Sequence, residues 1–208
     1  MRNLFRYLIL SVFLFVSASL YAQEKPRKDD GSFNKNRISL AYGFASVPRL
    51  AIGIGNLFGG AIKSLSSDIE AQTYTSFGPL SFTYDSNISK HLSIGVVFSY
   101  EYYSGERTWT DGETESEVDN IFTLMPKLTL RWGWQVVNFY HGISLGAGLW
   151  LTETEYSSGE TDSANYVTLA LHLCFFGISL NVGDTVSIFG DVGVGFLGMI
   201  NIGLALDF

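Results

Sequence analysis

The residues from Leu92 to Tyr103, "LSIGVVFSYEYY", alternate strictly in character, and this alternation restricts the possible folds more than any other feature. Successive side chains of a strand point to opposite faces of a sheet. One face of this segment is large and apolar, whereas the other includes small residues such as Ser93, Gly95 and Ser99. In a soluble sandwich, the face away from the core carries long charged side chains. The small residues instead predict a face that is crowded by other side chains.

The same pattern occurs eight times, so it predicts eight strands. They are expected at residues 37–45, 79–85, 92–103, 120–132, 138–151, 166–180, 185–196 and 200–208. An eight-stranded closed barrel has an interior just wide enough to be filled by side chains, while its apolar face contacts lipid. A soluble lipocalin-like barrel has as many strands, but its outer face is richly charged. The sequence therefore predicts an all-β fold: an eight-stranded antiparallel transmembrane β-barrel with up-and-down topology, closed by pairing of the last strand with the first.

The N-terminus has the organisation of a secretory signal peptide. Arg2 and Arg6 precede an apolar run over residues 7–16, and small residues follow up to Ala22. An uncleaved membrane anchor is the alternative, but the run is shorter than the ~20 residues of a spanning helix. We therefore expect a signal peptide at 1–22, a polar periplasmic leader at 23–36 and an outer-membrane barrel at 37–208.

The links between the expected strands alternate in length. Those after the second, fourth and sixth strands are short, whereas long loops are expected at residues 46–75, 104–119 and 152–165. Short turns at one end and long loops at the other are typical of outer-membrane barrels. The first long loop contains an apolar, glycine-rich stretch at 48–65, which is expected to cover the barrel mouth or to lie on the membrane as a helix.

Five polar residues fall on the luminal face of the expected strands. We predict that they form a structural polar network, which consists of Glu101, Lys127, Arg131, His172 and Asp191. Lys127 and Asp191 lie at similar heights above the short turns, so an ion pair between them is expected. Arg131 is the alternative partner of Asp191, because barrel shear can shift the match.

No residue pattern indicates catalysis. His141 and Ser144 fall on opposite faces of a strand, so they cannot act as base and nucleophile. His172 and Cys174 share the luminal face, where a structural histidine is a simpler interpretation than a catalytic dyad. We expect no enzymatic activity, no cofactor and no metal site.

Carboxylates are concentrated in the second and third long loops, at residues 106–119 and 153–162. A solvated acidic surface is one interpretation, and binding of divalent cations or a cationic partner is the other. The net charge of −7 argues against nucleic acid as a partner.

The segments "YHGISLGAGL" and "FGISLNVGDTVSIFGDVGVGFLGMINIGLALDF" resemble the small outer-membrane β-barrel proteins of Gram-negative bacteria, a group related to the OmpA-type membrane domain and to porin-like barrels. The resemblance implies an outer-membrane location and contact with lipid and lipopolysaccharide. It also implies that Phe208 is a signal read by the outer-membrane assembly machinery, and we expect a monomer. A structural or surface-interaction role is predicted. The alternatives are a small transport or channel protein for ions or small solutes, and a lipid-modifying enzyme.

Overall fold

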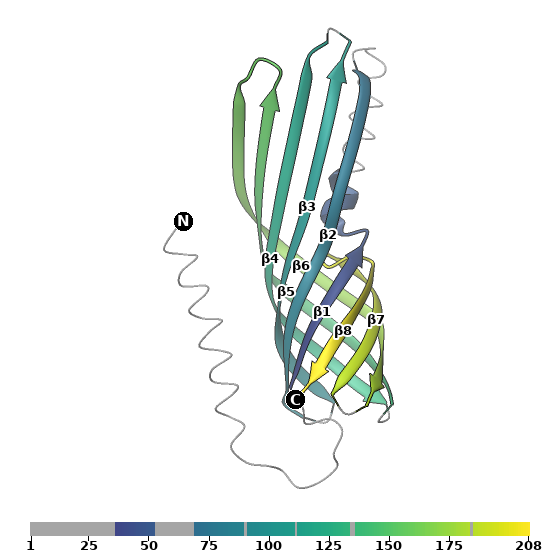
Figure 1. Ribbon diagram of the computed structural model, residues 1–208. Coiled ribbons are helices and arrows are strands. Elements are labelled where there is room, and N and C mark those ends of the chain that lie inside the picture. The colour runs from purple at the N-terminus through teal and green to yellow at the C-terminus, as the bar shows by residue number, and fades with distance from the viewer. Residues whose placement is uncertain (1–35, 53–68, 90, 111, 134–135, 184) are drawn as a thin grey trace. The chain divides into compact units, whose positions relative to one another are not determined.

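A computed structural model describes residues 36–52, 69–89, 91–110, 112–133, 136–183 and 185–208 (Figure 1). All of them belong to one compact unit, Asn34–Phe208. The expected signal peptide, residues 1–22, and the expected leader up to residue 35 lie outside the described residues.

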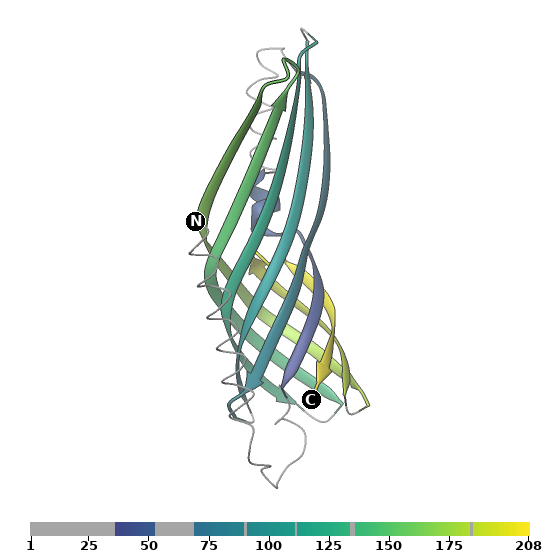
Figure 2. The ribbon, with the colours of Figure 1, turned by 60° about the vertical axis from the view of Figure 1, so that its left-hand side comes forward.

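Eight antiparallel strands form a closed barrel in chain order, as predicted. The strands are β1 Arg37–Phe44, β2 Ile69–Asn87, β3 Leu92–Trp109, β4 Thr114–Gly133, β5 Val137–Tyr156, β6 Thr161–Val182, β7 Val186–Gly195 and β8 Ile200–Asp207. The barrel closes where β1 pairs with β8, from Arg37 opposite Asp207 to Phe44 opposite Ile200 (Figure 2). Phe208 extends this seam, because its N–H donates to the Asn36 carbonyl and the Asn36 N–H donates back.

The two faces of each strand separate as the alternation predicts. On β8, the odd-numbered residues Asn201, Gly203 and Ala205 are buried in the lumen. The outer face carries exposed apolar side chains on every strand, among them Leu40, Phe82, Phe98, Leu128, Ile143, Leu180, Ile188 and Leu204. Such a belt matches a wall that faces lipid.

The strands differ greatly in length. β1, β7 and β8 have 8 to 10 residues, whereas β2 to β6 have 18 to 22. Figure 1 shows β2–β6 continuing as one sheet far beyond the ends of the other three strands. We call this part the extension; it comprises residues 69–77, 101–109, 114–121, 150–156 and 161–166.

The expected long loops at 104–119 and 152–165 are therefore wrong. β3 and β4 pair up to Thr108 opposite Thr114, and β5 and β6 pair up to Glu155 opposite Thr161. Tight turns close both hairpins, and Gly112 and Gly159 adopt the positive φ values of +88° and +82° there. The charged residues of these segments suggested loops, but they alternate with Thr, Ser and Val and pair across the strands.

The first long loop was also expected to begin at residue 46. Residues 47–52 form a short helix directly after β1, and β2 begins at Ile69. The rest of the predicted apolar stretch, residues 53–68, lies outside the described residues. Among the residues that the structure describes, no helix combines the length and the apolar character needed to cross a membrane.

The turn between β7 and β8 contributes side chains to the barrel interior. Leu197 packs with Val97, Met125 and Ala170 in an apolar cluster, and Phe196 packs against it. This cluster separates the charged lower lumen from the mouth of the barrel.

Candidate functional site: the filled lumen and the extension

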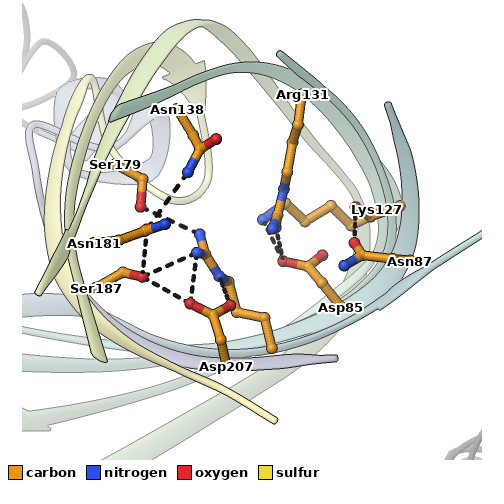
Figure 3. A network of polar contacts seen from close by, with 11 residues as sticks. Asp85, Asn87, Lys127, Arg131, Asn138, Ser179, Asn181, Ser187 and Asp207 are labelled. Atoms are coloured by element: carbon orange, nitrogen blue, oxygen red, sulfur yellow. Dashed lines mark hydrogen bonds and ion pairs between the residues drawn. The ribbon is translucent and has the colours of Figure 1, made fainter. Parts of the chain in front are cut away.

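The seam between β1 and β8 is sealed inside the barrel by an ion pair. Arg37 Nε lies 2.6 Å from Asp207 Oδ1, and Arg37 Nη2 lies 2.9 Å from Asp207 Oδ2. The Ser187 hydroxyl lies 2.7 Å from an Asp207 carboxylate oxygen, to which it donates, and 3.0 Å from the Asn181 side chain (Figure 3). A fork of two parallel hydrogen bonds is among the strongest polar contacts in proteins.

A second charged group lies beside the first. Asp85 on β2 accepts from Arg131 at 3.0 Å and lies 3.6 Å from Lys127 Nζ, with both cations on β4 (Figure 3). Asp85 is almost fully buried. The single carboxylate of Asp85 is therefore shared by the two cations Lys127 and Arg131, in a space that excludes most water.

The predicted pair of Lys127 and Asp191 is wrong. Asp191 accepts hydrogen bonds from Tyr140 at 2.9 Å and from Asn201 at 2.7 Å. Asp191 does face the lumen, so the prediction of its face is confirmed, whereas the prediction of Lys127 as its partner is wrong. The reason is that Asp85 lies opposite Gly95 on β3, and Gly95 lies opposite Lys127, so this carboxylate faces Lys127 across a glycine.

His172, another predicted luminal residue, is buried on the luminal face of β6 together with Cys174. Both side chains lie within electrostatic reach of Asp191 and Lys127. The structure thus places all five predicted residues in the lumen or at its mouth, but it divides them among separate contacts instead of joining them in one network.

The mouth of the barrel holds Glu101 under the short helix of residues 47–52. Ser46 donates to Glu101 at 2.7 Å, and Arg49 Nε lies 3.3 Å from the same carboxylate. Arg49 also donates to the carbonyl oxygen of Gly78 at 2.5 Å. That carbonyl lies at a β-bulge, where the pairing of β2 with β3 shifts between Phe77 and Leu80.

The face of the extension that continues the luminal face is acidic and aromatic. Arg107 lies 3.4 Å from Glu115 and 3.3 Å from Glu117. Asp119 accepts from Trp150 Nε1 at 2.9 Å and from Thr152 at 2.5 Å. Trp150 stacks on Tyr166 at a centroid distance of 5.4 Å.

Crowding of these charges affects their protonation. Burial raises the pKa of Glu117, and the nearby Asp119 raises it further, against the opposing effect of Arg107. Burial alone would lower the pKa of Arg107, but its contacts with Tyr74, Glu115 and Glu117 raise it above the usual value. Glu117 therefore protonates more readily on acidification than a glutamate in water.

β6 has a free strand edge in the extension and in the few residues just below it. β7 pairs with β6 only up to His172 opposite Gly195. The N–H of Tyr156 donates to the Glu160 carbonyl, so the backbone groups of Glu160 face β5. Because this direction alternates along an antiparallel strand, the backbone groups of Thr161 and of every second residue after it point away from β5. The carbonyl of Leu171 fits this assignment, because it accepts from Phe196 in the β7–β8 turn. Within the described residues, no strand pairs with the outward backbone groups of Thr161, Ser163, Asn165, Val167 and Leu169.

Sequence reasoning missed Arg37, Asp85 and Asp207 as parts of the luminal network. Each lies on the luminal face of its strand, two residues from a buried small residue: Ser39, Thr83 and Ala205. Their alternation alone would have identified them. Arg49 gave no such signal, because it lies beyond the end of β1.

The acidic segments are the candidate cation sites of the sequence. In the described part of the chain, no group of three or more His, Cys, Asp or Glu side chains is arranged to hold a metal ion. Two of the carboxylates, Glu115 and Glu117, are instead paired with Arg107.

Comparisons with known proteins give fold likeness only. No protein-family model matches the chain, and no curated protein sequence matches it. Among solved structures, it resembles Ail, the attachment invasion locus protein of Yersinia pestis, at 12% identity and a TM-score of 0.46, with 84% of this chain and 95% of that chain covered. Ail in complex with the heparin analogue sucrose octasulfate gives 13% identity and a TM-score of 0.45, over 83% and 94% of the two chains. We draw no functional conclusion from so distant a likeness.

Proposed function

We propose that the chain is an outer-membrane β-barrel protein that uses the extension as an interaction surface outside the cell. The free edge of β6 carries this proposal. Five outward-pointing residues have no partner strand there, in a sheet that continues beyond the closed barrel. Of their N–H groups, that of Ser163 donates at 2.9 Å to the neighbouring Asp162 side chain. A free edge is a template for strand addition, in which an extended peptide supplies the next strand.

The belt around the barrel supports a membrane location. Its outward side chains are large and apolar on all eight strands. The described basic residues are Arg37, Arg49, Arg107, Lys127 and Arg131, and each of them forms an ion pair with a carboxylate. A soluble protein rarely exposes an apolar belt of this extent. The signal-like N-terminus agrees with export.

The free edge also limits how high the lipid reaches. Unpaired backbone groups are not tolerated in hydrocarbon, so the outer boundary on this side lies no higher than about Leu171. Val167 and Leu169 are 65% and 71% exposed just above that level. The edge therefore presents apolar side chains together with unpaired backbone groups, which suits strand addition.

The charge of the extension favours a cationic or neutral partner. Glu115, Glu117, Asp119 and Asp162 share one face with Arg107 as the counter-charge. A polyanion would be repelled by this face. We therefore expect an extended peptide segment that is rich in Lys or Arg.

A synthetic peptide tests the proposal. The probe is a peptide of about ten residues in which Lys alternates with Val or Thr. The purified chain, folded in detergent, should bind it. The variant N165P, which removes an outward N–H from the edge, should lose most of this binding. The matched control N165A keeps the N–H and should bind like the wild type.

Two results would contradict the proposal: no binding by the wild type, or equal binding by N165P and N165A. A sulfated polysaccharide such as heparin serves as the opposite probe and should bind weakly. The membrane location has its own test. The folded barrel should migrate anomalously on a denaturing gel and shift on boiling, because a closed barrel has no free edge in its wall and unfolds reluctantly.

The contents of the lumen argue against a channel function. Its charges balance and are held by contacts, with Arg37, Arg49, Lys127 and Arg131 against Asp85, Glu101, Asp191 and Asp207. The apolar cluster of Val97, Met125, Ala170 and Leu197 also fills the lumen. We propose that the barrel does not conduct ions and that it catalyses no reaction. Recording in planar bilayers tests the first statement, since steady ohmic steps would refute it.

A further inference from the structure

The regular alternation of the barrel wall is broken at one place on β5 and β6. Tyr140 lies opposite Gly177 and Gly142 opposite Cys174, so His141 alone faces the pair Phe175 and Phe176. Phe175 is the inserted residue, because β7 pairs with Cys174 and Phe176 at consecutive positions. Both phenylalanines point outward as a result and are 57% and 47% exposed. A bulge of this kind redirects side chains and often marks a functional site.

The bulge fixes the orientation of an imidazole on the outer surface. His141 is exposed, and its Nδ1 contacts the backbone carbonyl oxygen of Phe175. A carbonyl oxygen can only accept, so Nδ1 carries the hydrogen. In the neutral ring, Nε2 is then left with a free lone pair.

Aromatic rings flank this imidazole. The Trp132 ring lies 4.6 Å from it and the Phe176 ring 6.4 Å, measured between centroids. Phe139 in turn packs on Phe176 at 5.6 Å. The result is an outward-facing cluster that combines one hydrogen-bond acceptor with several π faces.

The cluster lies near the end of the barrel that carries the short turns. His141 pairs with Leu130, and the next outward pair, Trp132 with Phe139, lies close to the strand ends at Gly133 and Val137. Trp side chains at such a level are typical of the boundary between hydrocarbon and headgroups. In the orientation proposed above, this boundary belongs to the inner, phospholipid leaflet.

We infer that His141, Trp132 and Phe176 form a binding site for the headgroup of a phospholipid with a primary ammonium, of the phosphatidylethanolamine class. The lone pair of His141 Nε2 accepts an N–H from the ammonium. The faces of Trp132 and Phe176 attract its positive charge. The inference rests on the proposed membrane location and adds a lipid preference to it.

The chemistry separates this headgroup from its methylated analogue. The ammonium of phosphatidylcholine has no N–H, so it cannot donate to Nε2, although it can still contact the rings. A charged imidazolium would instead donate to the phosphate. Both lipids carry the same phosphodiester, so that mode of binding would not distinguish them.

Native mass spectrometry of the purified full chain tests the site. The folded protein is given equal amounts of phosphatidylethanolamine and phosphatidylcholine with identical acyl chains, at about pH 8, where a histidine side chain in water is neutral. We expect the wild type to retain about ten times more phosphatidylethanolamine, the lower end of the effect that a hydrogen bond to a charged group provides. H141F should reduce this ratio to about one while keeping an aromatic surface.

The control removes the other exposed imidazole at this end of the barrel. His91 Nδ1 lies 3.0 Å from the Arg131 carbonyl oxygen, in the turn before β3, so H91F takes away a similar ring. It should leave the lipid ratio unchanged. Equal retention of both lipids by the wild type, an unchanged ratio in H141F, or the same loss in H91F would each overturn the inference. Failure of the wild type to form a heat-modifiable barrel would instead refute the membrane location.

Discussion

The strands β2 to β6 pass through two regions, the barrel and the extension, which share the same alternation but differ in what covers their inward face. In the barrel, their inward face is covered by the other strands, and the buried charges find partners such as Asp85 with Arg131 at 3.0 Å. In the extension, the same face is open, and both edges of the sheet, along β2 and along β6, lack a partner strand among the described residues. Closure by β1, β7 and β8 makes the difference, since the strands themselves are continuous.

This comparison separates stability from interaction. Inside the barrel, the ion pairs join strands that are not consecutive in the chain, as Arg37 joins Asp207 and Asp85 joins Arg131. In the extension, the ion pairs join neighbours in one hairpin, as Arg107 joins Glu115. We therefore expect changes in the lower region to alter unfolding, and changes in the upper region to alter binding.

Shortening the two hairpins of the extension should produce the largest effect. In this variant, residues 105–117 and 153–163 are each replaced by Asn-Gly, which forms a tight turn between the paired residues Ser104 and Val118 and between Thr152 and Ala164. We expect the barrel to fold, as judged by the heat shift on a gel. Peptide binding should fall sharply, because only Asn165, Val167 and Leu169 of the free edge remain. A shortened chain that binds the peptide as tightly as the full chain would show that these hairpins are not part of the interaction surface.

Replacement of Asp85 should affect the barrel instead. D85A leaves Lys127 and Arg131 without their shared carboxylate, and breaking a buried pair typically costs about 3–5 kcal/mol. Urea unfolding in detergent micelles measures this loss. D162N, which alters an exposed carboxylate of the extension, should change the unfolding free energy by less than about 0.5 kcal/mol. Equal losses in the two variants would remove the distinction between the regions.

Amide exchange can sharpen the comparison at single residues. On the free edge, Thr161 and Asn165 point their N–H groups outward, whereas Asp162 and Ala164 point theirs to β5. We expect exchange at the outward amides to be about a hundredfold faster, because those at Asp162 and Ala164 must open before they exchange. Bound peptide should slow the outward amides selectively. Uniform exchange along β6 would contradict the assigned edge.

The sequence was sufficient to predict the barrel because alternation is a local property. Each strand shows which face is crowded, and residues such as Ser93 or Gly203 carry that information by themselves. The number of strands, their faces and the closing pair of β1 and β8 follow from it. The same argument placed Glu101, Lys127, Arg131, His172 and Asp191 on the luminal side.

Partners and strand ends could not be predicted in this way. The partner of Lys127 depends on the stagger between β2, β3 and β4, which no single strand records, so Asp191 was expected where Asp85 is found. The extension was missed because its Glu and Thr residues have the composition of a loop. Their pairing becomes favourable only when five strands align. The bulge at Phe175 was missed because one inserted residue leaves the apolar character of β6 unchanged.

The smallest expected effect concerns pH and the acidic cluster of the extension. Burial and Asp119 raise the pKa of Glu117 in the folded chain above its value in the unfolded chain. Its contribution to stability is therefore present in full below the unfolded pKa, and it is lost as the pH rises through the folded pKa. The extension should open slightly more easily at pH 7 than at pH 5, by no more than about 0.5 kcal/mol, because the side chain is partly exposed and also contacts Arg107.

Amide exchange of residues 115–119, corrected for the intrinsic effect of pH, measures this difference. E117Q should abolish it, whereas E155Q, on the opposite face of the sheet, should keep it. Slower opening at pH 7, or an unchanged pH dependence in E117Q, would show that Glu117 is not the group that titrates.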